Sequence, residues 1–323
     1  MDNTASITEP QSDRRDDDLA ELIDGLRLPQ KTISPKYFYD EYGSELFEQI
    51  TRQPEYYPTR TELTILRMHI DEISDALGER VSLIEFGAGA SVKVRLLLDH
   101  APGIDVFVPV DISGDHLALA AQELAGDYPN IEVLPVAADF TRPFELPTPK
   151  RIPKRNVVFF PGSTIGNFAP ADAEQLMNTM RTVAKSGGGL LIGVDLKKDA
   201  GVLERAYNDA AGITAAFNLN MLTHLNRVYG SDFDQTCFLH RAIYNERHGR
   251  IEMHLVSTEA QTVALGGEHF KFAAGEYILT ECSYKYTVDE FAELAQRSGF
   301  RVTQVWTDVA QHFSLQFLDV VDR

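Results

Sequence analysis

Residues 81–111 read VSLIEFGAGASVKVRLLLDHAPGIDVFVPVD, and this stretch decides the fold. A first apolar run ends at Gly87 and Gly89, and a second ends at Asp111. Glycines after a strand let a ligand approach the backbone, and an aspartate at the next strand end can accept hydrogen bonds from ribose hydroxyls. The stretch predicts the opening of a nucleotide-binding α/β unit, although such turns also occur for structural reasons alone.

The cofactor expected at this turn has no phosphate groups. The dinucleotide fingerprint requires a third glycine where this chain has Val92, which disfavours a pyrophosphate on the helix N-terminus. A further apolar run, residues 131–137, precedes Asp139 and Phe140, which would reach the amino edge and one face of an adenine. Together with Asp111, these residues predict S-adenosylmethionine as the cofactor.

The composition narrows the function classes. The chain has 323 residues, 44% of them hydrophobic, which predicts one large domain and a smaller one. Lys and Arg total 30 against 48 Asp and Glu, and the net charge of -18 disfavours nucleic acid and anionic membranes as partners. Cys237 and Cys282 have no metal-ligand spacing, so no metal is expected. We therefore expect a small-molecule substrate.

The sequence also bears on where the protein is located and whether it has a membrane segment. Residues 1–18 are polar and acidic, which predicts a disordered tail and neither a secretory signal nor an anchor. No uncharged apolar run reaches the length of about 18 residues that a transmembrane helix needs. We expect a cytoplasmic monomer.

The apolar pattern predicts a Rossmann-like sheet with helices on both faces. The expected strands are 81–86, 106–110, 131–137, 156–160, 189–195, 301–306 and 312–321, and the expected helices are one from about 91, then 114–126, 170–185 and 288–299. Residues 197–230 read as one or two long helices and 233–286 as hairpin-like strands. We predict a cofactor-binding domain of residues 61–196 and 287–323, and an α+β substrate-binding domain of residues 19–60 and 197–286.

The loop after strand 156–160 is the expected acceptor site. It reads PGSTIGNF over residues 161–168, and its small residues bring backbone carbonyls to the strand end. Asn167 offers both a donor and an acceptor, which suits a substrate with an amine and a carboxylate. The alternative is that this loop only caps the following helix.

Several dispersed motifs resemble the histidine Nα-methyltransferases of ergothioneine biosynthesis. The motifs are PKYFYD (35–40), GSELF (43–47), PEYYPTRTE (54–62), GSTIGN (162–167), AYND (206–209), FN (217–218) and FAAGE (272–276). The resemblance runs from about residue 19 to the end of the chain. It implies an S-adenosylmethionine-dependent enzyme that trimethylates the α-amine of L-histidine to hercynine.

The resemblance also implies residue roles. Cofactor-binding residues of that family match Gly87, Lys93, Asp111, Asp139 and Phe140. In that family, residues that hold the substrate carboxylate match Tyr56, Asn167 and Tyr207, and a tyrosine near the amine matches Tyr39. Residues that contact the imidazole match Glu281, Ser283 and Met253. Phe47, Gly162 and Thr164 are further expected substrate contacts. Glu281 and Ser283 would share one face of a strand, although a solvated edge carboxylate is the alternative for Glu281, as an ordinary core residue is for Met253.

The implied reaction is displacement at a sulfonium methyl by a neutral amine, with no metal or covalent enzyme intermediate. Its demands are alignment and tolerance of the growing ammonium charge, which the Tyr39 or Phe47 ring could support by a cation–π contact. Whether Tyr39 also acts as a base is open, because a phenol is mostly protonated at neutral pH.

Three alternative functions remain possible from the sequence. A methyltransferase for tryptophan derivatives should lack the Glu281 and Ser283 pair, a dehydrogenase should have the third glycine, and a non-catalytic amino-acid sensor would have no use for the cofactor acids.

Overall fold

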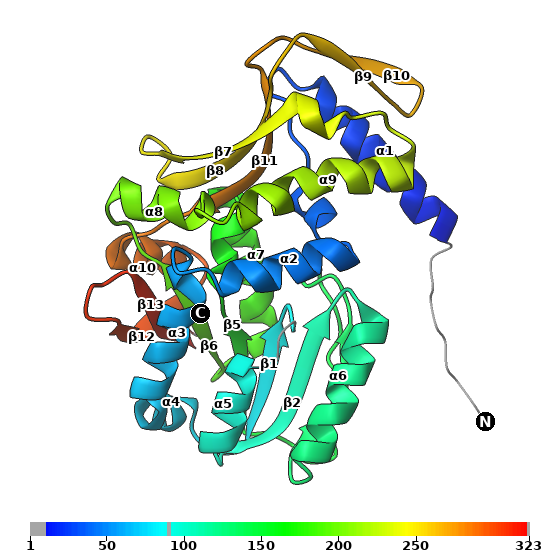
Figure 1. Ribbon diagram of the computed structural model, residues 1–323. Coiled ribbons are helices and arrows are strands. Elements are labelled where there is room, and N and C mark those ends of the chain that lie inside the picture. Colours follow the sequence, from blue (N-terminus) through cyan, green and yellow to red (C-terminus); the bar gives the residue numbers. More distant parts are fainter. Residues whose placement is uncertain (1–10, 89–91, 322–323) are drawn as a thin grey trace, which may run out of the picture. The chain divides into compact units, whose positions relative to one another are not determined.

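The computed structural model describes residues 11–88 and 92–321 (Figure 1). Gly89 therefore lies outside the described residues. The chain divides into two compact units. Unit 1 contains the described residues up to Tyr56 with Asp199–Arg247 and Ile251–Cys282, and unit 2 contains Tyr57–Lys198, His248–Arg250 and the described residues from Ser283 onward. The domain boundaries predicted at residues 60, 196 and 286 stay a prediction.

Unit 2 is built, among the described residues, on an eight-stranded sheet of order β12-β13-β6-β5-β1-β2-β3, with β4 also paired to β2. The strands are β1 (Val81–Phe86), β2 (Ile104–Asp111), β3 (Glu132–Val133), β4 (Val136–Ala137), β5 (Arg155–Phe160), β6 (Gly189–Asp195), β12 (Phe300–Thr307) and β13 (Phe313–Val320). β1 is parallel to both of its neighbours, β2 and β5, whereas β13 is antiparallel to β6. The strand order reverses at β1, which is where open α/β sheets bind ligands.

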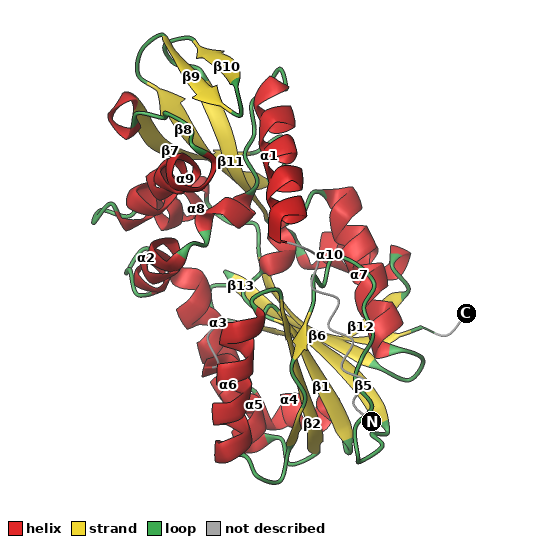
Figure 2. Ribbon diagram, turned by 90° about the vertical axis from the view of Figure 1, so that its right-hand side faces the viewer, coloured by secondary structure: helices red, strands yellow, loops and turns green. Residues whose placement is uncertain are grey.

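Helices cover both faces of this sheet, which confirms the predicted fold class (Figure 2). One face carries α3 (Tyr57–Met68), α4 (Ile70–Leu77), α5 (Val92–His100) and α6 (Gly114–Asp127), and the other carries α7 (Pro170–Ala184) and α10 (Val288–Arg297). A short 3₁₀ helix, η2 (Thr164–Asn167), follows β5.

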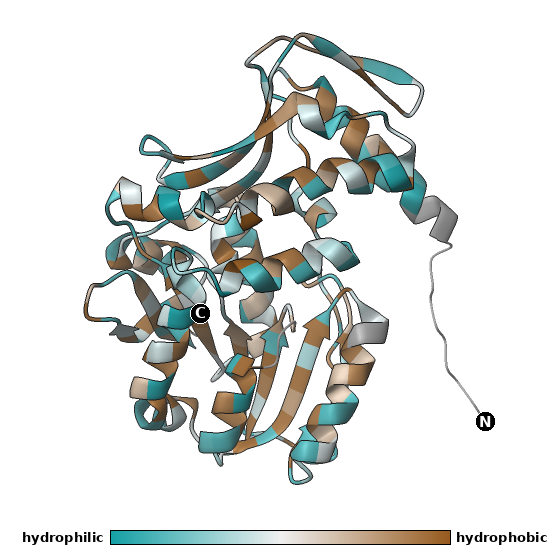
Figure 3. Cartoon of the chain, in the orientation of Figure 1, coloured by the Kyte–Doolittle hydropathy of each residue, from teal (hydrophilic) through white to brown (hydrophobic). Residues whose placement is uncertain are grey.

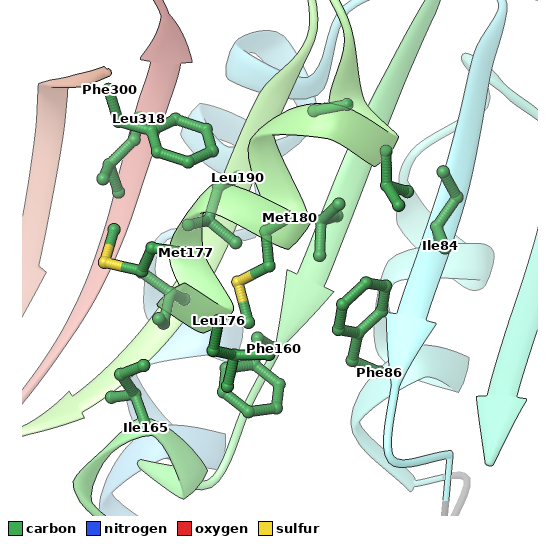
Figure 4. Packing of buried hydrophobic residues seen from close by; sticks show 14 of the residues in the cluster. Ile84, Phe86, Phe160, Ile165, Leu176, Met177, Met180, Leu190, Phe300 and Leu318 are labelled. Atoms are coloured by element: carbon green, nitrogen blue, oxygen red, sulfur yellow. The ribbon is translucent and has the colours of Figure 1, made fainter. Parts of the chain in front are cut away.

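Apolar strands fix this sheet in a two-sided core. All six residues of β1 are buried, and Figure 3 shows β1 and β2 as largely hydrophobic segments. On the α7 face, Phe86 and Phe160 of the strands pack in one cluster with Met177 and Met180 (Figure 4). Each buried side chain of this size contributes about 1.5–3 kcal/mol. This burial positions the strand ends that carry the candidate site.

One predicted strand is shorter than expected. Residues 131–137 form two two-residue strands, β3 and β4, with Leu134 and Pro135 between them. Proline has no backbone N–H to donate to the ladder, which accounts for the break.

Unit 1 combines helices with two small sheets. The helices are α1 (Gln11–Arg27), η1 (Pro35–Phe38), α2 (Glu41–Thr51), α8 (Ala200–Tyr207), α9 (Ile213–Tyr229) and η3 (Gln235–Cys237). A three-stranded sheet has the order β11-β8-β7, and β9 pairs with β10. The strands are β7 (Phe238–Asn245), β8 (Arg250–Ser257), β9 (Gln261–Leu265), β10 (Glu268–Phe272) and β11 (Tyr277–Tyr284), whose last two residues fall in unit 2.

The predicted tail of residues 1–18 is wrong for residues 11–18, which belong to α1. Leu22 and Leu26 bury the apolar face of this helix. Its polar first half is held by an ion pair of 2.7 Å between Asp18 and Lys36. Residues 1–10 lie outside the described residues.

Candidate functional site

The carboxyl end of β1 turns at Gly87. This glycine has a φ of +74°, which other residues rarely adopt, and its N–H donates to the Val110 carbonyl at 2.9 Å. A Cβ at Gly87 would lie 3.6 Å from the Phe140 ring, so a side chain here would fill the space beside that ring. Asp111 ends β2, directly beside this turn.

The segment after β4 reaches the same edge. Ala138 N–H donates to the Asp111 carbonyl at 3.0 Å, and the Phe140 ring stacks on Phe86 with centroids 5.5 Å apart. Asp139 accepts hydrogen bonds from the backbone and hydroxyl of Thr141 at 2.9 and 2.6 Å, which fixes its turn. The structure therefore brings Gly87, Asp111, Asp139 and Phe140 to one edge of the sheet.

Lys93, on α5, is held by a buried carboxylate that the sequence analysis did not select. Glu62 on α3 lies 2.5 Å from Lys93 Nζ, and its side chain has no exposed surface. Both carboxylate oxygens of Glu62 also accept from the Gly162 N–H, at 2.9 Å each. A Cβ at Gly193 would come within 2.1 Å of this carboxylate, so a side chain at position 193 would displace Glu62. Glu62 thus joins two expected ligand-binding residues, Lys93 and Gly162.

A second buried acid lies at the end of β1. Glu85 is 4% exposed, and its burial raises its pKa to about 8, with Lys93 opposing the shift and Glu62 and Asp111 adding to it. Glu85 is therefore largely protonated at neutral pH and can donate a hydrogen bond.

The loop after β5 is tightly constrained. Gly162 and Ser163 have φ angles of +80° and +56°, and Thr164 donates its hydroxyl to the Pro161 carbonyl at 3.0 Å. A Cβ at Gly166 would lie 2.7 Å from the Tyr284 carbonyl. The exposed Asn167 ends η2, and the N-cap of α7 is Ala169. Asn167 therefore does not serve as the cap of α7.

A buried charge cluster supports this loop from the end of β6. Asp195 is 1% exposed and accepts from the Tyr57 hydroxyl at 2.7 and 2.8 Å and from Lys198 Nζ at 2.6 Å, and Lys285 Nζ lies 2.8 Å away. The Asp195 N–H donates to Ser163 Oγ at 2.9 Å. The cluster thereby fixes the left-handed turn of the loop.

Opposing effects set the protonation of this cluster. Burial alone would raise the pKa of Asp195, but Lys285 and Lys198 outweigh it and hold that pKa below its ordinary value. Burial lowers the pKa of Lys198 to about 8, although Asp195 opposes the shift. Lys285 also donates to Ser283 Oγ at 2.8 Å, so the cluster reaches an expected imidazole contact. Ser283 is 3% exposed.

Expected substrate contacts of unit 1 form an aromatic chain. The ring of Tyr39 lies 5.8 Å from those of Phe47 and Phe217, that of Phe47 lies 6.5 Å from Tyr56, and that of Tyr56 lies 6.3 Å from Tyr207. All four contacts are edge-to-face, a favoured geometry for aromatic rings. Phe217 was not selected as a substrate contact from the sequence, although it belongs to the FN motif of residues 217–218.

Tyr39 has a neutral phenol. Burial and the Glu281 carboxylate raise its pKa above the ordinary value, and Tyr207 adds to the shift. Because 48% of the residue surface is exposed, solvent weakens this shift without reversing its direction. The phenol can donate and accept hydrogen bonds but is a poor base at neutral pH.

The two imidazole contacts expected on β11 fall on either side of the unit boundary. Glu281 belongs to unit 1 and is partly exposed, whereas Ser283 belongs to unit 2. Met253 on β8 is 2% exposed, and its carbonyl accepts from the Thr280 hydroxyl at 3.0 Å.

Two findings concern metals and membranes. The described residues contain no group of three or more His, Cys, Asp or Glu side chains that could hold a metal ion. No helix within residues 11–88 and 92–321 has the length and hydropathy to cross a membrane.

The fold and the edge of β1 define a class of protein. A parallel sheet closed by an antiparallel C-terminal hairpin, with a glycine turn and acidic strand ends at its reversal point, is the Rossmann-like sheet of S-adenosylmethionine-dependent methyltransferases. A family model described as "Histidine-specific methyltransferase, SAM-dependent" matches residues 18–320. The chain belongs to this family, and S-adenosylmethionine is its cofactor.

Curated relatives agree with the family model. The chain is 44% identical to a histidine N-alpha-methyltransferase from Mycolicibacterium smegmatis over 90% of this chain and 91% of the relative. It is 39% identical to a protein of the same name from Mycobacterium tuberculosis, over 91% and 92% of the two chains. It is also 29% identical to ergothioneine biosynthesis protein 1 from Schizosaccharomyces pombe, over 85% of this chain and 37% of that longer protein.

The residues at the β1 edge fit a phosphate-free adenosine cofactor. Gly87 leaves open space beside the Phe140 ring, where a Cβ would otherwise stand. The carboxylates of Asp111 and Asp139 suit hydroxyl and amino donors and would repel a pyrophosphate.

Proposed function

We propose that this chain transfers three methyl groups from S-adenosylmethionine to the α-amine of L-histidine and so forms hercynine, the first step of ergothioneine biosynthesis. The match of the histidine-specific family model over residues 18–320 is the observation that carries this proposal. The name of the relative from Mycolicibacterium smegmatis, 44% identical over nearly the whole chain, supports it.

Unit 2 is proposed to hold the cofactor. When bound, S-adenosylmethionine supplies an electrophilic methyl group on a positively charged sulfur. Asp111 is proposed to accept from the ribose hydroxyls, Asp139 from the adenine amino group, and Phe140 to cover one face of the adenine. Lys93 is proposed to bind the cofactor's carboxylate. Its side chain is 15% exposed, and this exposed part can reach a ligand.

The substrate roles are proposed for residues of both units. In unit 1, Tyr56 and Tyr207 are proposed to donate their hydroxyls to the histidine carboxylate, and the partly exposed Glu281 is proposed to accept a hydrogen bond from the imidazole N–H. In unit 2, Asn167 is proposed to bind the carboxylate and Ser283 the imidazole. A bound substrate that covers these polar groups and leaves them without hydrogen bonds would be rejected.

The amine is proposed to be oriented by Tyr39 and not deprotonated by it. The raised pKa of this phenol leaves it neutral, so its oxygen can accept a hydrogen bond from the amine. Its ring and that of Phe47 can support the single ammonium charge that develops on the nitrogen during each methyl transfer, which is followed by loss of a proton before the next transfer.

A competition among amino acids tests the proposal. The purified protein is incubated with S-adenosylmethionine and a panel of free amino acids, and mass spectrometry follows gains of one, two and three methyl groups. We expect histidine alone to reach three, and Glu281→Ala to weaken histidine relative to apolar amino acids. Methylation of tryptophan in place of histidine would contradict the proposed substrate. The absence of turnover with any amine would contradict the proposed methyltransferase activity.

A further inference from the structure

A single buried amide in unit 1 joins the helix α9 to three strands of the sheet. Asn218 has no exposed surface. Its Nδ2 donates to the His254 carbonyl of β8 at 3.1 Å and contacts His240 Nδ1 of β7 at 2.9 Å, and its Oδ1 accepts from the Thr280 hydroxyl of β11 at 2.8 Å. A buried amide with this many partners fixes the elements that it joins.

These bonds determine the orientation of the amide and the form of the histidine. A carbonyl can only accept, so the side of Asn218 that faces His254 must be the NH₂ group. That group also donates to His240 Nδ1, which must then lack a proton. The proton of His240 is therefore on Nε2, which donates to the Tyr207 carbonyl at 2.8 Å.

Each branch of the network ends beside a proposed substrate contact. Through His240, Asn218 holds the backbone of Tyr207 at the end of α8. The Thr280 hydroxyl lies between Asn218 and the Met253 carbonyl, 2.8 and 3.0 Å away, and Thr280 immediately precedes Glu281. The backbones of Tyr207, Met253 and Glu281 are thereby fixed from one point.

We propose that Asn218 is a positioning residue for histidine binding, which acts through His240 and Thr280 on the placement of Tyr207, Met253 and Glu281. This inference rests on the proposed function, because it takes these three residues as substrate contacts. Burial lowers the pKa of His240, which keeps the ring neutral, while the Tyr207 carbonyl and Asp209 oppose the shift and His254 adds to it.

Asn218→Ala removes the network, and Asn226→Ala is its matched control. Asn226 lies on the same helix, and its side chain also makes three hydrogen bonds. It donates to the Phe233 carbonyl at 2.8 Å and accepts from the Phe233 N–H at 2.9 Å and from the Ser231 hydroxyl at 2.7 Å, but it bonds to neither His240 nor Thr280. We expect Asn218→Ala to raise the KM for histidine about tenfold or more, and to leave the KM for S-adenosylmethionine within about twofold. Asn226→Ala should leave both KM values unchanged.

Three further variants keep the test decisive if Asn218→Ala does not fold. Thr280→Val replaces the hydroxyl with a methyl group and should raise the KM for histidine. Thr280→Ser keeps the hydroxyl and should keep the KM for histidine at its wild-type value. Asn218→Asp places a carboxylate against His240 Nδ1, and should shift the pH dependence of the histidine KM to higher pH.

The outcomes separate this inference from the proposed function. If the wild-type protein methylates histidine but Thr280→Val and Asn218→Asp change neither the KM nor its pH dependence, the network has no positioning role. If the wild-type protein does not methylate histidine, the proposed function fails first, and the inference fails with it.

Discussion

Replacing Glu62 by glutamine removes a charge from the interior of unit 2 while preserving the shape of the side chain. The carboxylate has no exposed surface, lies 2.5 Å from Lys93 Nζ and accepts from the Gly162 N–H at 2.9 Å. A hydrogen bond to a charged group contributes about 1.5–3 kcal/mol and a neutral one about 0.5–1.5 kcal/mol. With two partners affected, we expect Glu62→Gln to lower the free energy of unfolding by about 2–3 kcal/mol.

Thermal unfolding measures this loss. For a unit of this size, about 2–4 °C per kcal/mol predicts a fall in Tm of about 4–12 °C. Glu79→Gln is the matched control, because Glu79 also pairs with a lysine, Lys154, at 3.0 Å, but both side chains are more than half exposed. That control should leave Tm unchanged.

Cofactor binding gives a second readout for the same variant. Isothermal titration should show weaker binding of S-adenosylmethionine to Glu62→Gln, because Lys93 and Gly162 lose their common anchor. A Tm within about 1 °C of wild type would refute the role of Glu62 in stability. Strict additivity of Glu62→Gln and Lys93→Met would refute the coupling of the pair.

Three further predictions concern protonation and charge. Burial raises the pKa of Glu85 from 4.5 to about 8, so between these pH values the folded state keeps a proton that the unfolded state has released. Stability should therefore fall as the pH rises through this window. Glu85→Gln should flatten the pH dependence of Tm, and an unchanged slope would contradict this prediction. Asp195→Asn leaves Lys198 and Lys285 without their shared carboxylate, and urea denaturation should reveal a loss of about 3 kcal/mol or more, whereas a loss below about 1 kcal/mol would contradict the cluster's role. Tyr39→Phe should raise the KM for histidine, keep kcat within about tenfold of wild type and leave the pH profile of kcat unchanged. The reason is that a general base contributes about 10²–10⁴-fold to the rate, and a neutral phenol is not a general base. A larger loss of kcat with an altered pH profile would show that Tyr39 acts as a base.

The sheet could be predicted from the sequence because its strands are buried on both faces. Continuous apolar runs such as residues 81–86 and 156–160 predict buried strands. Asp111 and Asp139, which come after two other apolar runs, mark carboxyl ends of the sheet. Pro135 was a local signal that was not used, and it divides the predicted strand 131–137 into two. The first turns of α1 were missed because their polar residues carry no apolar pattern.

The buried polar network could not be predicted, because its partners are distant in the sequence. Glu62 and Gly162 are 100 residues apart, and both were present in recognised motifs without any signal of their contact. Asp195 depends on Lys285, which lies in a different part of the chain. An isolated lysine or aspartate in a sequence is most often solvated, so only the fold identifies those that are paired and buried.

The position of the added methyl groups shows whether the protein trimethylates the α-amine of histidine. The protein is incubated with S-adenosylmethionine and L-histidine, and tandem mass spectrometry of the product locates each added methyl group. We expect three methyl groups on the α-nitrogen and an unmodified imidazole ring. Methylation of the ring, or a product that stops at one or two methyl groups with excess cofactor present, would contradict this expectation.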